Sequence, residues 1–193
     1  NKTISRYWIK FITHQTNIKF KAPKLKVNQL KDFEIEVAIK SERFALDSNV
    51  FSLIIGARWP NFNSIDQYYQ VGFAPNSYVG VQKFYGGQYS NLTPWKKSST
   101  YKNNDFNILT YRKVGFKEYY YFNGDLIFSR KFTGFFGDNL GVAFSPKTKM
   151  SLDYFRVSYL TEPDRTPPLI TISSTDVSRG FKIVERNNRV TIK

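Results

Sequence analysis

The stretch EYYYFNGDLIFSRKF, residues 118–132, contains the clearest indication of fold in this sequence. Its central pair, Asn123 and Gly124, is typical of a type I′ turn, because both central positions of that turn need a positive φ. The residues on either side are aromatic and β-branched, so the stretch predicts a β-hairpin. A two-residue loop pairs Phe122 with Asp125, Tyr121 with Leu126, Tyr120 with Ile127 and Tyr119 with Phe128.

Both faces of this predicted hairpin are apolar, whereas a strand with one face in water would alternate with polar residues. We therefore expect one face to lie in the core between two sheets. The other face is expected to line a concave surface or to lie beneath a loop. The first face carries Tyr120, Phe122 and Ile127, and the second carries Tyr119, Tyr121, Leu126 and Phe128.

Alternating stretches of the same kind recur along the chain, with turn residues between them and almost no helical periodicity. Short strands at this spacing are typical of a β-sandwich or barrel. The sequence therefore predicts an all-β fold. The predicted strands span residues 6–13, 17–22, 32–40, 51–59, 67–74, 78–85, 107–114, 118–122, 125–132, 139–145 and 151–160.

Composition limits the class of protein. The 193 residues are 41% hydrophobic and 18% aromatic, which is enough to bury a core. No apolar run is long enough for a membrane span. The absence of cysteine excludes a disulfide scaffold, a thiolate zinc site and a cysteine nucleophile. The sequence starts with Asn1 instead of Met, so we expect that an upstream segment has been removed.

Composition changes at TEPDRTPPLITISS, residues 161–174, where three prolines fall within six residues. Proline blocks regular strand pairing and favours extended chain. We therefore predict one sandwich domain over residues 1–162. Residues 163–193 form either a linker with the opening strands of a second β module, or a terminal ribbon docked on the first domain.

Several motifs of the chain follow one another in a familiar order. An apolar strand ends in Gly56, a paired-aromatic strand carries Tyr68 and Tyr69, and the Asn-Gly hairpin follows. A glycine-rich run at 137–142 then precedes the closing strand LDYFRV at 152–157. Residues 30–160 thus resemble the concanavalin A-like lectin/glucanase superfamily, and within it the bacterial laminin-G-like jelly rolls grouped with 3-keto-disaccharide hydrolase-type domains.

The resemblance implies a jelly-roll β-sandwich of two antiparallel sheets. It also implies that Tyr120, Phe122 and Ile127 face the core. The tail, with DRTPPLITISS followed by RGFKIV, resembles the opening of a bacterial immunoglobulin-like module.

Net charge is +14, and residues 1–31 contain eight bases and no acid. This segment either attracts an anionic polymer such as a polysaccharide or lipopolysaccharide, or forms solvated strand faces. Nucleic acid is not expected as a partner, because no nucleic-acid-binding motif accompanies the charge.

Three acids, Asp32, Glu34 and Glu36, alternate along one predicted strand. Residues two apart on a strand are about 7 Å apart, which is compatible with the paired carboxylates of glycoside hydrolysis. Glucanases of the resembled superfamily carry an E-x-D-x-x-E pattern, which this sequence lacks. The alternative is that the apolar residues between them face the core and the acids face water.

No cofactor is expected. The single histidine, His14, lies between two predicted strands and fits a surface turn better than a general base. Calcium remains an alternative at Asp138 and Asn139, or at Asp153, because hard cations take carboxylate and carbonyl oxygens. We expect Asp153 to form hydrogen bonds in a turn.

Two ring-bearing, amide-rich stretches, 56–69 and 85–99, are the candidate binding loops. Trp and Tyr rings stack on the C–H faces of sugars, while amides and Arg bond the hydroxyls. Alternatively, the tryptophans anchor their loops against the sandwich. The candidate residues are Arg58, Trp59, Asn61, Tyr85, Gln88 and Trp95, together with Tyr119 and Tyr121 of the hairpin.

These observations favour a non-catalytic module that binds a glycan or another protein, within a larger extracytoplasmic bacterial protein. One alternative is a saccharide hydrolase or lyase that uses the acids of the 32–36 strand with Arg58. The other is a structural spacer, because jelly rolls serve all three purposes.

Overall fold

The computed structural model describes residues 9–12, 18–43, 46, 50–58, 67–145, 148–160, 183–186 and 189–192. The chain divides into two compact units, Asn1–Thr161 and Glu162–Lys193. The second unit contains one described hairpin, β14 (Ile183–Arg186) with β15 (Arg189–Ile192). That this hairpin opens an immunoglobulin-like module stays a prediction, as does the domain division made from the sequence.

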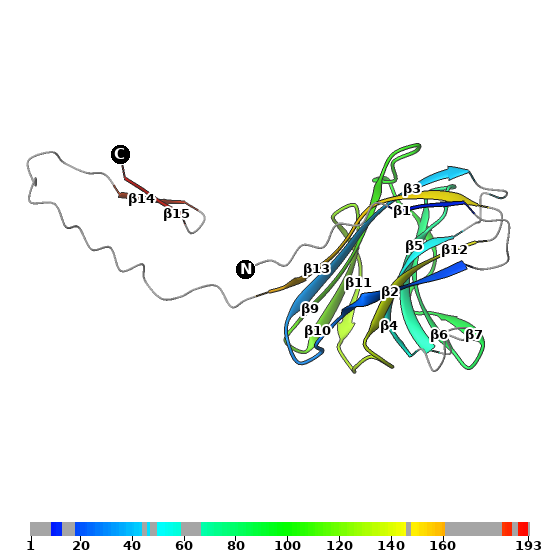
Figure 1. Ribbon diagram of the computed structural model, residues 1–193, viewed down its shortest axis with the longest axis horizontal. Helices are drawn as coiled ribbons and strands as arrows, with labels where there is room; N and C mark the ends of the chain where they lie inside the picture. The colour runs from blue at the N-terminus through cyan, green and yellow to red at the C-terminus, as the bar shows by residue number, and fades with distance from the viewer. Residues whose placement is uncertain are drawn as a thin grey trace, which may run out of the picture. The chain divides into compact units, whose positions relative to one another are not determined.

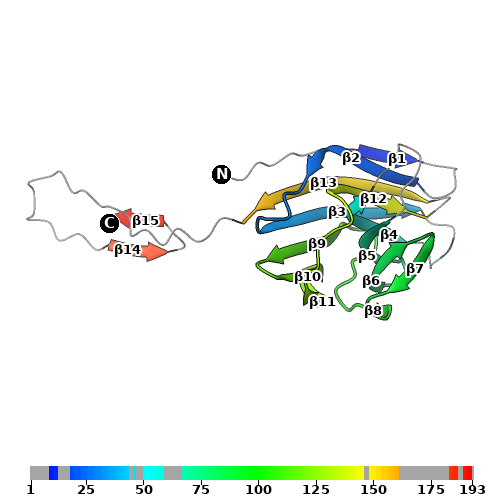
Figure 2. The same cartoon turned by 90° about the horizontal axis from the view of Figure 1, so that it is seen from below.

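The first unit consists of two antiparallel sheets that form facing layers, visible in Figures 1 and 2. We call them sheet A and sheet B. Sheet A has the order β1 (Ile9–Ile12), β13 (Lys149–Tyr159), β3 (Phe33–Arg43), β9 (Asn107–Val114), β10 (Lys117–Phe122), β11 (Asp125–Lys131). Sheet B has the order β2 (Ile18–Lys26), β12 (Asn139–Phe144), β4 (Phe51–Arg58), β5 (Gln67–Phe73), β6 (Tyr78–Tyr85), β7 (Gln88–Asn91), and β8 (Lys96–Lys97) also pairs with β6.

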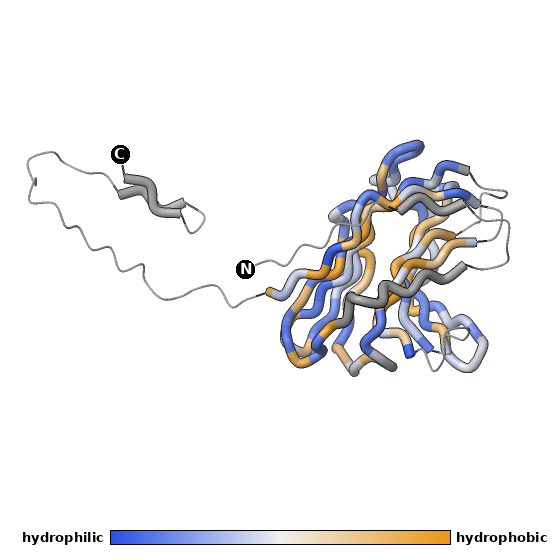
Figure 3. The backbone as a smooth tube through the Cα atoms, in the orientation of Figure 1, coloured by the Kyte–Doolittle hydropathy of each residue, from blue (hydrophilic) through white to orange (hydrophobic). Residues whose placement is uncertain are grey.

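The core lies between the sheets and is built from every second residue of their strands. On β3, for example, Phe33, Ile35 and Val37 are fully buried, as the alternation predicts. Figure 3 shows hydrophobic and polar residues alternating along strands of both layers. Strand β4 is buried throughout residues 51–57, in agreement with its continuous apolar sequence. No described residue is helical, and so none belongs to a helix that could cross a membrane.

The Asn-Gly hairpin is confirmed as β10 and β11. Asn123 has a φ of 48° and Gly124 a φ of 90°, as a type I′ turn requires. The Asn123 side chain also ties the turn to neighbouring segments. Its Oδ1 accepts a hydrogen bond from the Ile108 N–H at 2.7 Å, and its Nδ2 donates to the carbonyl oxygen of Thr100 at 2.7 Å.

The predicted register is correct next to the turn and wrong beyond it. Tyr121 pairs with Leu126, but Tyr120 pairs with Phe128 instead of Ile127. A β-bulge in β11 inserts Ile127 as an extra residue. Phe128 therefore moves to the core side, where its ring centroid lies 5.8 Å from that of Tyr120. Because Ile127 and Phe128 are both apolar, the sequence pattern contains no indication of this shift.

The stretch 85–99, which the sequence predicts as a binding loop, contains two further strands. Gly86 and Gly87, with φ of 58° and 81°, form the tight turn between β6 and β7. All four residues of β7 are exposed, so its sequence has no apolar alternation that could indicate a strand.

Candidate functional site

A row of polar side chains crosses the outer face of sheet B. The Ser52 hydroxyl lies 3.2 Å from Gln70 Oε1 and donates a hydrogen bond to it. Gln70 Nε2 donates to Gln82 Oε1 at 2.7 Å, and Gln82 Nε2 donates to Asn91 Oδ1 at 2.8 Å. The row begins at buried Ser52 and Gln70 and ends at exposed Asn91. Because each amide orients the next, the Asn91 amide nitrogen is left as a donor at the surface.

A cluster of rings lies on one side of this row, two residues further along the strands. Phe84 stacks on Tyr68 with centroids 5.0 Å apart, and its centroid lies 4.9 Å from that of Tyr89. The hydroxyls of Tyr68 and Tyr89 are hydrogen-bonded at 2.8 Å. Tyr68 is fully buried, whereas Tyr89 is 53% exposed. Burial, followed by the bond to Tyr89, raises the pKa of Tyr68 far above its ordinary value, so its phenol stays protonated.

Trp95 lies on the other side of the row, over the backbone of Gly80. A Cβ at Gly80 would come within 2.7 Å of the indole ring. Glycine is therefore needed here to let the ring rest on β6. Trp95 is partly buried by this contact and partly exposed.

These groups form one strip. Residues 80, 82 and 84 alternate along β6 and therefore share the outer face of sheet B, spaced about 7 Å apart. Across the ladder, Asn91 pairs with Gln82 and Tyr89 with Phe84. We call this set the β6–β7 strip, and define it as Trp95, Gln82, Asn91, Phe84 and Tyr89. It places amides between two aromatic ends.

The strip contains one of the residues that the sequence singles out, Trp95. Tyr85 and Gln88 pair with each other, one position along from Phe84 and Tyr89, so they face the opposite side of the β6–β7 ribbon. The Tyr85 ring packs against Phe136, with centroids 5.8 Å apart.

The first loop contributes three candidate residues, of which the structure describes one. Arg58 is the exposed last residue of β4. Trp59 and Asn61 lie outside the described residues, as does His14.

Tyr119 and Tyr121 lie on the outer face of sheet A. Their rings stack at 24° with centroids 6.4 Å apart, and the Arg112 guanidinium lies 5.5 Å from the Tyr121 centroid. The side of β10 that carries these tyrosines is thus only partly buried. Those of the predicted site residues that the structure describes are therefore divided between the two sheets.

The strip residues Gln82, Phe84, Tyr89 and Asn91 were not predicted from the sequence. One indication was present, because Gly80, Gln82 and Phe84 alternate with the core residues Val79 and Val81. That pattern places Gln82 and Phe84 on the outer face. It contains no information about which residues of β7 stand beside them.

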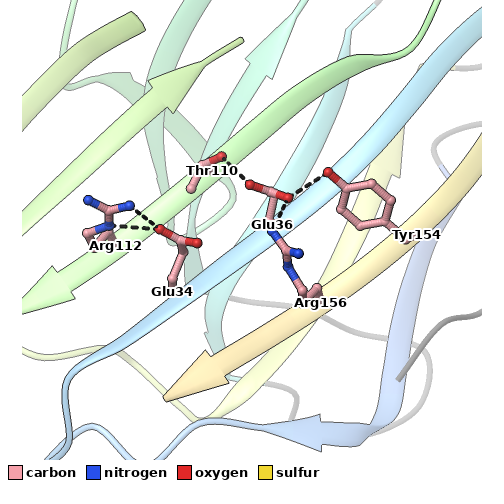
Figure 4. Close-up of polar contacts among 6 residues, drawn as sticks. All are labelled: Glu34, Glu36, Thr110, Arg112, Tyr154 and Arg156. Carbon is pink, nitrogen blue, oxygen red and sulfur yellow. Dashed lines mark hydrogen bonds and ion pairs between the residues drawn. The ribbon is translucent and has the colours of Figure 1, made fainter. Parts of the chain in front are cut away.

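The acids of β3 lie on the outer face of sheet A and are paired with bases, as Figure 4 shows for two of them. Glu34 Oε2 lies 2.5 Å from Arg112 Nη2, and Glu36 Oε1 lies 2.5 Å from Arg156 Nη2. Glu36 also accepts a hydrogen bond from the Tyr154 hydroxyl at 2.6 Å. Burial, followed by this bond, raises the pKa of Tyr154.

Asp32 is similarly engaged. Its Oδ1 lies 3.1 Å from Lys113 Nζ and accepts a hydrogen bond from the Gly115 N–H at 2.8 Å. The alternation that places the intervening apolar residues in the core is confirmed. Glu34 and Glu36 thus face away from the core, and each of the three carboxylates is held by a cation.

A further carboxylate, Glu118, is buried between the sheets with 1% of its surface exposed. It accepts a hydrogen bond from the Tyr111 hydroxyl at 2.8 Å and forms an ion pair with Arg130. The Arg130 guanidinium lies 4.5 Å from the centroid of the Tyr69 ring. Sequence alternation indicates this burial, because Glu118 shares its strand face with Tyr120 and Phe122.

Among the described residues no group of three or more His, Asp and Glu side chains is placed to hold a metal ion. At one predicted calcium position, Asn139 donates its side-chain amide to the carbonyl oxygen of Ala57 at 3.0 Å. Calcium at Asp138 and Asn139, or at Asp153, stays a prediction.

No protein-family model matches the sequence, and no curated protein matches it. Solved structures do match. The carbohydrate binding module CBM66 from Bacillus subtilis superposes with a TM-score of 0.58 at 13% identity, over 80% of this chain and 92% of that chain. The fold is a concanavalin A-like jelly roll.

The same jelly roll is found in proteins with different descriptions. A Bacillus subtilis protein of unknown function with a galectin-like fold matches with a TM-score of 0.52 at 11% identity, over 83% of this chain and 88% of that chain. A prokaryotic β-1,3-1,4-glucanase (lichenase) from a mouse hindgut metagenome matches with a TM-score of 0.50 at 11% identity, over 67% of this chain and 66% of that chain. At these identities the likeness concerns the fold alone.

Proposed function

We propose that this jelly roll is a non-catalytic glycan-binding module and that it binds through the β6–β7 strip. The observation that carries the proposal is the position of the Gln82 and Asn91 amides between Trp95 at one end and Phe84 with Tyr89 at the other. Partly exposed rings beside polar groups are what a sugar-binding surface needs.

The strip supplies both kinds of contact that a saccharide offers. The indole of Trp95 and the half-exposed ring of Tyr89 present apolar surface for the C–H faces of sugar rings. The Asn91 amide presents hydrogen-bond donors for hydroxyl oxygens. The hydrogen bonds of the row that starts at buried Ser52 already hold this amide in one orientation. Binding a sugar therefore costs less side-chain conformational entropy.

The site chemistry favours binding over hydrolysis. None of the five strip residues is a carboxylate, and Glu34 and Glu36 belong to the other sheet. Both of these acids are already engaged in ion pairs with arginines, whereas the paired carboxyl groups of a glycosidase must be open to the substrate. The carbohydrate binding module CBM66 supports the proposal as a glycan-binding protein of the same fold.

Two further parts of the proposal concern context. We place the protein outside the cytoplasm, as a module of a larger bacterial protein, where polysaccharides are met. A protein ligand and a spacer role remain alternatives. Attraction of an anionic polymer to residues 1–31 also remains a proposal, since residues 1–8 and 13–17 of that segment lie outside the described residues.

A binding assay with two variants tests the strip. We expect Trp95→Ala to lower the affinity for a bound polysaccharide about tenfold and Asn91→Ala about fivefold, by loss of a stacking contact and of a hydrogen bond. The matched control is Ser90→Ala, because Ser90 is an exposed neighbour on the opposite face of β7. Affinity electrophoresis in gels that contain single polysaccharides measures these changes, and thermal unfolding checks the fold.

Gly80→Ala tests the same site with a second variant, because the added Cβ displaces the Trp95 indole without deleting it. We expect it to weaken binding as Trp95→Ala does. Retention of full affinity by Trp95→Ala and Gly80→Ala, in folded protein, would contradict the proposed site. Absence of any bound polysaccharide would favour the protein-ligand or spacer alternatives.

A further inference from the structure

The part of the chain that builds the strip contains no acid. Residues 67–104, which include all of β5 to β8, contain Lys83, Lys96, Lys97 and Lys102 but neither Asp nor Glu. Elsewhere in the first unit, five described bases are in ion pairs with acids, as Arg112 is with Glu34. This segment therefore carries positive charge with no counter-charge of its own, and positive charge on a surface attracts anionic ligands.

One of these lysines continues the strip. In the pairing of β8 with β6, Lys97 stands opposite Tyr78, and Lys96 stands opposite Val79. Val79 is a core residue, so Tyr78 and Lys97 share the outer face with Gly80, on which Trp95 rests. Lys97 is thus the next side chain beyond the Trp95 end, and Lys96 points to the other side.

Lys97 is also available to a ligand. It is exposed, and no described residue forms an ion pair or hydrogen bond with its ammonium group. The distance along β6 from the level of Lys97 to Phe84 is about 20 Å, at 3.3 Å per residue. This length suits a chain of several sugars, with its anionic group at the Lys97 end.

We propose that the ligand of the strip is an acidic polysaccharide, and that Lys97 binds its carboxylate or sulfate group. This inference rests on the proposed function, and it names the class of glycan that the strip takes. The ammonium of Lys97 donates charge-assisted hydrogen bonds to the anionic group while Trp95 stacks on the same or the adjoining sugar. Lys83 and Lys102 add to the positive potential and favour encounter, so binding weakens as salt screens exposed charges.

The test compares acidic polymers with matched neutral ones. Polygalacturonate is paired with its carboxyl-reduced form, and dextran sulfate with dextran, so that carboxylate and sulfate are distinguished. We expect one of the acidic polymers to bind at least about tenfold more tightly than its neutral match. We expect Lys97→Gln to lower that affinity about tenfold and Lys96→Gln to leave it unchanged within about twofold, although both remove the same charge.

The outcomes separate this inference from the proposed function. If a neutral polymer binds as well as its acidic match and Trp95→Ala abolishes the binding, the acidic specificity is wrong while the glycan site stands. If Lys96→Gln and Lys97→Gln weaken binding equally, the specific role of Lys97 is wrong, and the affinity depends only on the overall positive charge of the surface. If none of the four polymers binds, both proposals are contradicted.

Discussion

At the scale of single residues, the contribution of a charged side chain to stability depends on whether it is buried. Glu118 and Glu34 each form an ion pair with an arginine, but Glu118 is buried between the sheets and Glu34 lies on the outer face. Removing one partner of a buried pair leaves the other as an uncompensated charge. An outer pair competes with water and contributes little. The two glutamates therefore form a matched comparison.

We expect Glu118→Gln to lower the free energy of unfolding by about 3 kcal/mol, because Arg130 loses its counter-charge. Glu34→Gln should lower it by only about 0.5 kcal/mol, since that pair is partly exposed. Urea unfolding followed by fluorescence measures both values. Equal losses in the two variants would show that burial does not govern the strength of these pairs.

At the scale of elements, the turn between β10 and β11 performs two separable tasks. Its backbone reverses the chain with a positive φ at Asn123, and its side chain connects the turn to Thr100, Asn107 and Ile108. Glycine accepts a positive φ but has no side chain that could form these hydrogen bonds. Alanine disfavours a positive φ and cannot form the hydrogen bonds either. Two substitutions at this one position therefore separate the two contributions.

We expect Asn123→Gly to lower the free energy of unfolding by about 2 kcal/mol, through loss of the side-chain hydrogen bonds. Asn123→Ala should cost about 1 kcal/mol more, because its Cβ disfavours the left-handed conformation. Both values come from urea unfolding of the two variants and the parent protein. A smaller loss for Asn123→Ala than for Asn123→Gly would contradict the role of the positive φ.

At the scale of the whole molecule, buried tyrosines in both sheets make the free energy of unfolding depend on pH. Burial raises the pKa values of Tyr68, Tyr111 and Tyr120 well above the ordinary value of about 10. Tyr68 lies on the outer face of sheet B, and the other two lie between the sheets. Unfolding returns these phenols to water and to their ordinary pKa. Above about pH 10 the unfolded chain therefore binds fewer protons than the folded chain, and stability falls as pH rises.

We expect the contribution of these tyrosines to be fully present below about pH 10 and to be lost at about 1.4 kcal/mol per pH unit for each of them above it. Urea unfolding at several pH values, with tyrosinate absorbance recorded in parallel, measures the slope. Tyr111→Phe should reduce the slope by the contribution of one tyrosine, about 1.4 kcal/mol per pH unit. Tyrosinate absorbance that develops fully while the protein remains folded would contradict the prediction.

The sequence by itself determined the layers of this protein. Alternation within each strand depends only on neighbours along the chain, so it correctly assigned Phe33, Ile35 and Val37 to the core and the acids between them to the outside. The Asn-Gly pair determined its hairpin for a similar reason, because the positive φ is a property of those two residues. These signals are local, and the fold could be predicted from them.

Only the tertiary structure decided which residues of different strands meet. The strip depends on the register of β6 with β7, which brings Gln82 beside Asn91, and on the missing Cβ of Gly80, which admits Trp95. The bulge at Ile127 shifted the register of β11, so that Phe128 as well as Ile127 packs against the core. Register and bulges are set by packing across the whole sandwich, and a single strand's sequence does not encode its partner.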